Sequence, residues 1–408
     1  MMQRWKTTAL LALIALLGVG QSPLSGQTPT VRYLPGSGQQ ICQLTGETDR
    51  ERGEPTLNRT ESRFGLAGTD LGASFEHDGK LYFFFGDTIG ARTGREQEGQ
   101  QRKGQGNDSV AFSDDFAPDD CLKLTFITDT NGRFRSPRVP GVSLLNFEVP
   151  TGGFSLNGTM YVFFTTDHSE QRVMGRSLLA RSRDDARSFE FVYNLSTEKF
   201  INVAPVVVDN AEIPGLPQTQ GQGVLLWGSG PYRRSDPFLA YLPASSVEQP
   251  QTLRFFAGLD GDNRPRWSAE EPQAVPLFSH PCIGELSVAW NPFLKKWLML
   301  YNCGDPRGIN FRAADEPWGP WSGAQVLFQP WEDQGYCHFI HVSWKAQRCD
   351  NVHDPKRQNV WGGEYGPYLI PQLTTGDDAR TTIYFVMSTW NPYNVMLMKA
   401  TLEVDGAS

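Results

Sequence analysis

Two aspartates, Asp70 and Asp87, stand at the open ends of a predicted β-hairpin and are the first candidates for chemistry in this chain. The turn signal between them is Asp78-Gly79, which separates two apolar runs. This dipeptide favours a type I′ turn, in which both central residues need positive φ. Counting outward from that turn places Asp70 directly opposite Asp87. Because like charges in opposed positions destabilise a sheet, we interpret the pair as functional rather than as a solvated strand end.

Two neighbouring carboxyl groups are what the hydrolysis of a glycosidic bond requires. One protonates the leaving oxygen, and the other acts as a base or a nucleophile. Close carboxyl groups also push their pKa values apart, so that one stays protonated while the other ionises near neutral pH. A separation of ~5–5.5 Å predicts a retaining enzyme, and one of ~6.5–9.5 Å predicts an inverting enzyme. Asp70 and Asp87 are therefore our candidate catalytic residues.

The hairpin at 68–87 resembles four later segments of the chain. A second unit follows around Asn157-Gly158, and superposing the two turns puts Val149 and Thr166 at the aspartate positions. The scaffold thus recurs without the acids. The other apolar units are at 223–241, 284–314 and 365–400. Repeated strand meanders without helical periodicity predict an all-β fold, a five-bladed β-propeller of the sialidase-like kind. The alternative is a pair of β-sandwich domains.

Further polar candidates stand near strand ends, as Asp70 does. Glu285 and Glu364 begin the fourth and fifth units and would reach the axial face, although Glu285 also fits a hydrogen bond between blades. Arg233 fits the carboxylate of an acidic sugar or a solvated strand end. We assign all three to substrate binding, together with Trp390 and Tyr393, because flat sugar faces stack on aromatic rings. Most of the 11 Trp are expected in the core.

The composition narrows the class of protein. The chain has 408 residues, a net charge of −8, 20% charged and 12% aromatic residues, with 41 Gly and 28 Pro. This composition is typical of a turn-rich β protein. The acidic balance argues against a nucleic-acid partner. A monomer that acts on a polysaccharide is expected.

The N-terminus resembles an export signal. Arg4 and Lys6 precede an apolar run at 9–17, and small residues follow. We predict a signal peptide at 1–27, a polar lead-in at 28–64 and a catalytic propeller at 65–403. No later run is long enough to cross a bilayer, so a secreted or periplasmic location is expected. Residues 92–107 are predicted to form a long polar loop after Asp87, either an insertion or a cleft wall.

Six cysteines in an exported chain predict three disulfides. Six cysteines allow 15 connectivities, and we favour neighbours in sequence. The expected pairs are Cys337–Cys349, Cys282–Cys303 and, by elimination, Cys42–Cys121. No metal site is expected, because no pair has C-x₂-C spacing. No cofactor is expected either, since G-x-S-x-G, H-E-x-x-H and phosphate-binding glycine loops are missing from the sequence.

Several motifs resemble the bacterial family catalogued as domain of unknown function 4185. These are Gly68-Thr69-Asp70, Phe85-Gly86-Asp87, Gly284 to Val288, Arg312 to Ala314, Pro317 to Trp321, Ser388 to Val395 and Leu397-Met398. The resemblance implies a five-bladed sialidase-like propeller. Some members of that family are endo-acting D-arabinofuranosidases that cut the D-arabinan of mycobacterial cell walls. Asp70 and Asp87 match the aspartate pair that serves catalysis in those members, and the resemblance favours inversion.

The sequence therefore predicts an exported glycoside hydrolase that cleaves arabinofuranosyl linkages in an arabinose-rich bacterial polysaccharide. The aspartate pair would act as general acid and base. Two other functions remain open. One is a glycan-binding propeller without catalysis. The other is a sialidase-like hydrolase, which should carry three arginines around the axis, whereas only Arg233 or Arg234 ends a strand suitably.

Overall fold

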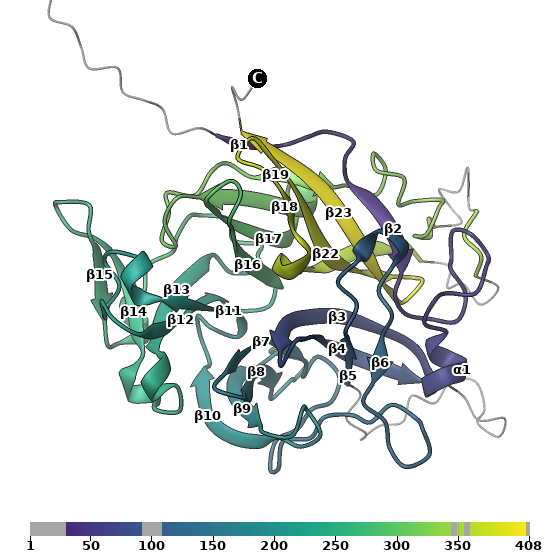
Figure 1. Ribbon diagram of the computed structural model, residues 1–408, viewed down its shortest axis with the longest axis horizontal. Coiled ribbons are helices and arrows are strands. Elements are labelled where there is room, and N and C mark those ends of the chain that lie inside the picture. Colours follow the sequence, from purple (N-terminus) through teal and green to yellow (C-terminus); the bar gives the residue numbers. More distant parts are fainter. Residues whose placement is uncertain (1–29, 92–107, 344–348, 350, 355–359, 405–408) are drawn as a thin grey trace, which may run out of the picture.

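The computed structural model describes residues 30–91, 108–343, 349, 351–354 and 360–404. Its strands form five antiparallel sheets, and Figure 1 shows them arranged around a central axis. The fold is thus the predicted all-β, five-bladed β-propeller. The expected signal peptide at 1–27 and the polar loop at 92–107 lie outside the described residues.

Each blade is built from strands that follow one another in the sequence. Blade 1 contains β3 (Leu66–His77), β4 (Lys80–Gly90), β5 (Ser109–Ser113) and β6 (Thr125–Phe126). Blade 2 contains β7 (Pro150–Leu156), β8 (Thr159–Thr166), β9 (Arg176–Ser182) and β10 (Glu190–Ser196). Blade 3 contains β11 (Asn202–Asp209), β12 (Gln222–Ser229), β13 (Pro237–Pro243), β14 (Arg254–Leu259) and β15 (Pro265–Ser268). Blade 4 contains β16 (Leu286–Asn291), β17 (Lys296–Gly304), β18 (Arg307–Ala314) and β19 (Gln325–Phe328).

Blade 5 joins the two ends of the chain. It contains β20 (Gly363–Leu369), β21 (Thr375–Gly376), β22 (Arg380–Trp390) and β23 (Asn394–Val404), and both β1 (Val31–Tyr33) and β2 (Gln39–Gln43) pair with β23. Figure 1 shows β1 beside β23 near the C-terminus. The segment predicted as a lead-in, which also holds α1 (Thr60–Phe64), therefore supplies two strands of the last sheet. The blade is closed by hydrogen bonds between segments far apart in sequence.

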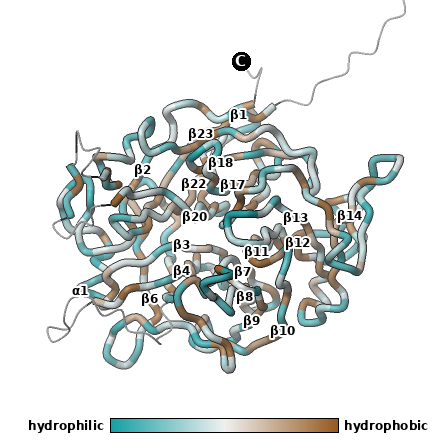
Figure 2. Tube along the Cα trace, turned by 180° about the vertical axis from the view of Figure 1, so that it is seen from behind, coloured by the Kyte–Doolittle hydropathy of each residue, from teal (hydrophilic) through white to brown (hydrophobic). Residues whose placement is uncertain are grey.

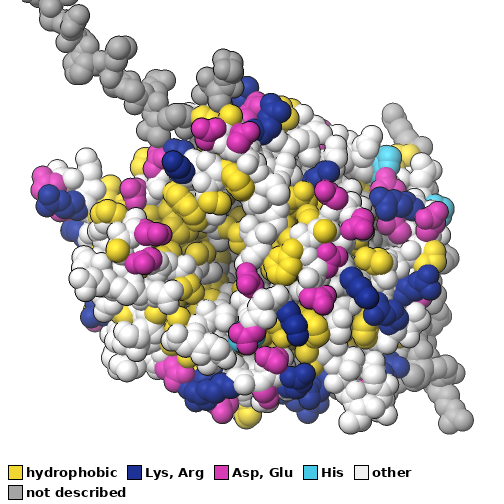
Figure 3. Space-filling model, in the orientation of Figure 1, with side chains coloured by type: hydrophobic (Ala, Val, Ile, Leu, Met, Phe, Trp, Pro, Cys, Tyr) yellow, Lys and Arg dark blue, Asp and Glu magenta, His cyan; other side chains and the backbone are white. Residues whose placement is uncertain are grey.

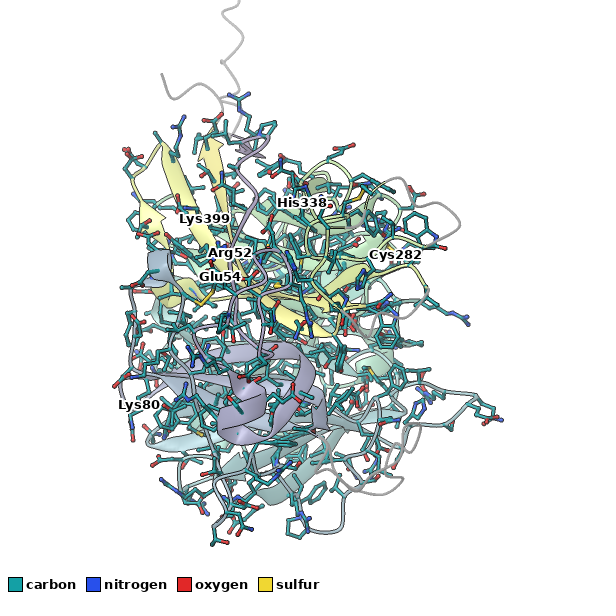
Figure 4. All side chains as sticks on the ribbon, turned by 90° about the vertical axis from the view of Figure 1, so that its right-hand side faces the viewer. Arg52, Glu54, Lys80, Cys282, His338 and Lys399 are labelled. Atoms are coloured by element: carbon teal, nitrogen blue, oxygen red, sulfur yellow. A yellow bond between two sulfur atoms is a disulfide. The ribbon has the colours of Figure 1, made fainter. Side chains whose placement is uncertain are left out.

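The innermost strands are β3, β7, β11, β16 and β20, and each contacts its neighbours around the ring. We call the face where these strands begin the upper face. Figure 4, a side view, shows Lys80 after the first hairpin turn on one side of the molecule, and Cys282 on the other. Cys282 lies in the loop that precedes β16, so it marks the upper face.

The sequence analysis missed the inner strand of blade 3. It began the third unit at Gly223, whereas the blade begins at Asn202 with β11. Pro205 lies within β11, and a proline ordinarily argues against a central strand because it has no N–H to donate. An inner strand of a propeller has one edge without a hydrogen-bonded strand, which accommodates that missing donor. Pro150 in β7 and Pro367 in β20 occupy inner strands in the same way.

Apolar side chains pack within and between the blades. The largest fully buried side chains include Trp227, Tyr241, Tyr301 and Phe311. Figure 2 shows hydrophobic segments along the strands of the ring and hydrophilic segments in many of the surrounding loops. Figure 3 shows acidic and basic side chains interspersed over the face that it draws.

All three predicted disulfides are present in the fold. Cys42–Cys121, Cys282–Cys303 and Cys337–Cys349 have Cα atoms 5.7, 5.4 and 5.5 Å apart. Disulfides persist in oxidising compartments, which supports the predicted secreted or periplasmic location. Within the described residues, no helix is both long and apolar enough to cross a bilayer.

Candidate active site

The first hairpin has the predicted turn but a shifted register. Asp78 and Gly79 have φ of 47° and 74°, as a type I′ turn requires. Farther from the turn, a bulge between Leu71 and Ala73 shifts the pairing by one residue. Asp70 therefore lies opposite Gly86, and the predicted direct opposition of Asp70 and Asp87 is wrong. The corresponding part of blade 2 contains the same bulge, so the irregularity belongs to the repeated scaffold.

Asp70 is buried at the upper end of β3, with 8% of its surface exposed. Its Oδ2 atom accepts a hydrogen bond of 2.9 Å from the Tyr365 hydroxyl, which comes from β20. Its Oδ1 atom is buried and makes no hydrogen bond with the described residues. Burial of a carboxylate with few donors disfavours its ionised form. This environment is suited to a carboxyl group that holds a proton.

Glycines in the two sequence motifs make room for this arrangement. A Cβ atom on Gly86 would lie 2.8 Å from Asp70 Oδ1, so a side chain there would displace the carboxyl group. A Cβ atom on Gly68 would lie 2.8 Å from the Tyr393 carbonyl oxygen. The glycines thus allow the carboxyl group and the Tyr393 backbone to approach the hairpin closely.

Asp87 follows Gly86 in β4 and has a positive φ of 39°, which is uncommon outside glycine. Both oxygens of its carboxyl group accept the backbone N–H of Phe147, at 3.0 and 3.1 Å. Its own N–H donates to Asp108 Oδ1 at 3.2 Å, and its carbonyl oxygen accepts the Tyr393 hydroxyl at 3.1 Å. Four contacts to three other segments therefore fix both the backbone and the side chain of Asp87.

The two aspartates interact electrostatically although they are not cross-strand partners. The pKa of Asp70 is raised to about 8, chiefly by burial and then by the charge of Asp87, while hydrogen bonds from the Tyr365 and Tyr393 hydroxyls lower it. The pKa of Asp87 is raised to about 6, chiefly by burial and also by the charge of Glu148, while the hydrogen bond from the Phe147 N–H lowers it. Near pH 7, Asp70 is therefore mostly protonated and Asp87 mostly ionised. The site offers one acid and one base at the same pH.

A third carboxyl group, Asp108, was not predicted from the sequence. It is 1% exposed, and its Oδ2 atom has no hydrogen-bond partner among the described residues. Burial, followed by the charges of Asp87 and Asp70, raises its pKa well above the ordinary value. The sequence did carry a signal. Asp108 directly precedes β5, whose Ser109 pairs with Phe85, so that it had to lie beside Gly86 and Asp87.

We expect that Asp108 is neutral and that it positions Asp87 by accepting the Asp87 N–H. Asp108→Asn keeps a carbonyl oxygen for the Asp87 N–H and should retain turnover within about threefold. Asp108→Ala leaves that buried N–H without an acceptor, which costs about 1–3 kcal/mol, and should lower turnover tenfold or more. Turnover and melting temperature of both variants would be measured. Equal damage by both variants would contradict this interpretation, since it would mean that the negative charge itself is required.

Glu285 and Arg233 form an ion pair next to the aspartates. Arg233 Nη2 lies 3.3 Å from Glu285 Oε1, and the Tyr232 hydroxyl donates to the same oxygen at 3.1 Å. Glu285 is 2% exposed, and its charge contributes to the raised pKa of Asp70. The guanidinium of Arg233 lies over the Tyr365 ring, with its Cζ atom 5.5 Å from the ring centroid. The structure therefore brings both sequence candidates close to Asp70, with Arg233 partly exposed to solvent.

Glu364 makes a similar pair with an arginine that the sequence analysis did not single out. Arg307 Nη2 lies 3.4 Å from Glu364 Oε2, and the Arg307 guanidinium also donates to the Tyr336 hydroxyl. Burial raises the pKa of Glu364, whereas the charges of Arg307 and Arg233 lower it. Glu364 thus faces Arg233 as well, and the two arginine–glutamate pairs are neighbours at the upper face.

Trp390 and Tyr393 form one wall of an open pocket, which the aspartate side chains do not line but which Tyr393 connects to Asp87. The pocket has a volume of about 190 Å³ and is also lined by Gly68, Ile89 and Arg50. The ring centroids of Trp390 and Tyr393 are 5.9 Å apart, and Trp390 is 46% exposed. Tyr393 links this wall to Asp87 through its hydroxyl. An exposed indole ring at this position can stack on a flat sugar face.

Among the described residues, two clusters have a geometry that could hold a metal ion. One contains Cys282 and Cys303, which form a disulfide and so offer no thiolates. The other contains His77, Asp78 and Asp185, next to the turn at the lower face. Neither cluster includes the candidate catalytic aspartates.

A comparison with known protein families places the chain in one of them. A family model described as "Domain of unknown function (DUF4185)" matches residues 56–399. No curated protein matches the chain.

Solved structures are similar to this chain at low identity. The GH43_1 enzyme of Xanthomonas citri in complex with xylotriose is 11% identical, with a TM-score of 0.42, covering 82% of this chain and 86% of that one. The family 117 glycoside hydrolase Zg3597 of Zobellia galactanivorans is 10% identical, with a TM-score of 0.43 and coverages of 92% and 90%. A putative exo-β-1,3-galactanase of Bifidobacterium bifidum is 7% identical, with a TM-score of 0.43 and coverages of 91% and 97%. Similarity at this level carries no argument about activity.

Proposed function

The chain belongs to the DUF4185 family, and we propose that it is a glycoside hydrolase with Asp70 and Asp87 as its catalytic pair. The observation that carries the proposal is the contrast between the buried Asp70 and the partly buried Asp87, whose pKa values are raised to about 8 and about 6, with Tyr393 connecting Asp87 to an open pocket that holds the exposed Trp390. Folding alone does not call for two carboxyl groups that repel each other at one site largely shielded from solvent.

The roles of the two aspartates follow from their surroundings. Asp70 holds its proton near neutral pH and is suited to protonate the leaving oxygen. Asp87 is ionised at the same pH, and the Phe147 N–H fixes its orientation. It acts as the base that activates water or as the nucleophile, and we favour the base, as the family resemblance implies. Tyr365 holds the acid, and Tyr393 joins the backbone of the base to the pocket wall.

The surroundings of the pair favour a neutral sugar. Arg233 and Arg307 are each paired with a buried glutamate, and Arg50, which lines the pocket, is paired with Asp354. The carboxylate of an acidic sugar would have to compete with Glu285, Glu364 or Asp354 for these arginines. This arrangement argues against the sialidase-like alternative. Together with the motif resemblance, it supports the arabinofuranosyl linkages of an arabinose-rich bacterial polysaccharide as the substrate.

A hydrolysis assay tests the proposed function. Purified protein would be incubated with arabinogalactan between pH 4 and 10, and released oligosaccharides would be measured. The base must be ionised and the acid protonated, so we expect a bell-shaped profile with limbs near pH 6 and pH 8. Absence of products at every pH, together with retention of the protein by the polysaccharide, would favour the non-catalytic glycan-binding propeller instead.

A further inference from the structure

A second group of aromatic side chains, two of them exposed, lies on the upper face outside the pocket that contains Trp390. It consists of Trp331, Tyr336 and Trp361, in the loop between β19 and β20, and we call it the aromatic platform. Tyr336 is buried under the two tryptophans, with ring centroids 4.7 Å from Trp331 and 5.3 Å from Trp361. Trp331 is 54% exposed and Trp361 is 41% exposed. Two indole rings are thus held in place and presented to solvent.

The platform is continuous with the candidate active site in two ways. The backbone after Trp361 runs beside Trp390, because Gly363 pairs with Trp390 and a Cβ atom on Gly362 would lie 2.7 Å from the Trp390 carbonyl oxygen. The Tyr336 hydroxyl also binds Arg307, which is paired with Glu364. Contacts therefore lead from Trp390 along the rim of blade 5 to the platform, and from the platform inward to the arginine–glutamate pairs.

We propose that the aromatic platform is a remote sugar-binding subsite, which holds a neutral polysaccharide chain several residues from the bond cleaved at the aspartates. This inference rests on the proposed function and extends it to a substrate longer than the pocket. Exposed tryptophans on a continuous rim suit flat sugar faces, and the half-exposed Arg307 can donate to sugar hydroxyls while Glu364 neutralises its charge. A soluble protein rarely exposes clustered large apolar side chains without a binding role.

Affinity electrophoresis tests the subsite without depending on hydrolysis. The protein would carry Asp70→Asn to prevent cleavage, and it would migrate through gels that contain arabinogalactan, linear arabinan, xylan or galactan. The double substitution Trp331→Ala and Trp361→Ala should weaken binding to the retained polysaccharide about tenfold, or about 1.4 kcal/mol, because both exposed ring surfaces are lost. Trp290→Ala is the matched control, because Trp290 is 40% exposed but ends β16 at the lower face.

The outcomes separate the subsite from the catalytic proposal. Weaker binding in the platform variant but not in the Trp290 control would support the subsite, even where the unmodified protein hydrolyses no substrate. Unchanged binding in the platform variant, equal loss in the control, or no retention by any of the four polysaccharides would overturn it. Where hydrolysis is measurable, kcat/KM for arabinogalactan relative to that for 4-nitrophenyl arabinofuranoside should fall about tenfold in the platform variant.

Discussion

Asp70→Asn is expected to lower turnover on arabinogalactan by about 10²–10⁴-fold, the range in which a general acid contributes. The amide resembles the carboxyl group in size and can still accept the Tyr365 hydroxyl, but it cannot deliver a proton to the leaving oxygen. The loss should be much smaller on a 4-nitrophenyl glycoside, because nitrophenolate leaves without protonation. Rates on both substrates would be compared with those of the unmodified protein. Equal losses on the two substrates would contradict the assignment of Asp70 as the acid.

The same variant should alter stability in a direction that a structural residue would not show. The pKa of Asp70 is raised from 3.8 to about 8, so the folded state keeps a proton that the unfolded chain releases. Stability of the unmodified protein therefore declines as pH rises from about 4 to about 8. Asp70→Asn cannot ionise, and it should melt at a higher temperature than the unmodified protein at pH 8, with the difference fading near pH 4. A lower melting temperature at pH 8 would indicate a structural role.

The blade architecture could be predicted from the sequence because its signals are local. The turn at Asp78-Gly79 has the predicted conformation, since only certain residues tolerate positive φ at both central positions. The later apolar runs are also local signals, and they correspond to strands in the other sheets. Neighbouring cysteines also paired as expected. Each of these features depends on residues that are close in the sequence.

The register at the aspartates could not be obtained by counting from the turn. The bulge adds a residue at Gly72, which has a φ of 112°. An isolated glycine within a strand pattern does suggest a bulge, but it does not give the resulting position of Asp70. The partners that define the site come from other blades and loops, namely Tyr365, Phe147 and Tyr393. Such contacts depend on how the ring closes, which strand periodicity does not reveal.

Asp87→Asn should also lower turnover by two or more orders of magnitude, but with a different signature. The leaving group still receives its proton from Asp70, so a 4-nitrophenyl glycoside should be affected as severely as arabinogalactan. The acidic limb of the pH profile near pH 6 should disappear from the residual activity, because it reports ionisation of Asp87. Both substrates and the full pH profile would be measured.

Added azide provides the control for this second variant. A small anion can occupy the space of the missing carboxylate and attack the anomeric carbon, so azide should restore part of the turnover and yield a glycosyl azide. Asp70→Asn retains Asp87 and serves as the comparison, while melting curves show whether both variants remain folded. The Phe147 N–H should still find an acceptor in the Asn side chain, so the fold should persist. Normal turnover in Asp87→Asn would remove this residue from the catalytic set, and Glu285, whose charge also acts on Asp70, would be the next candidate.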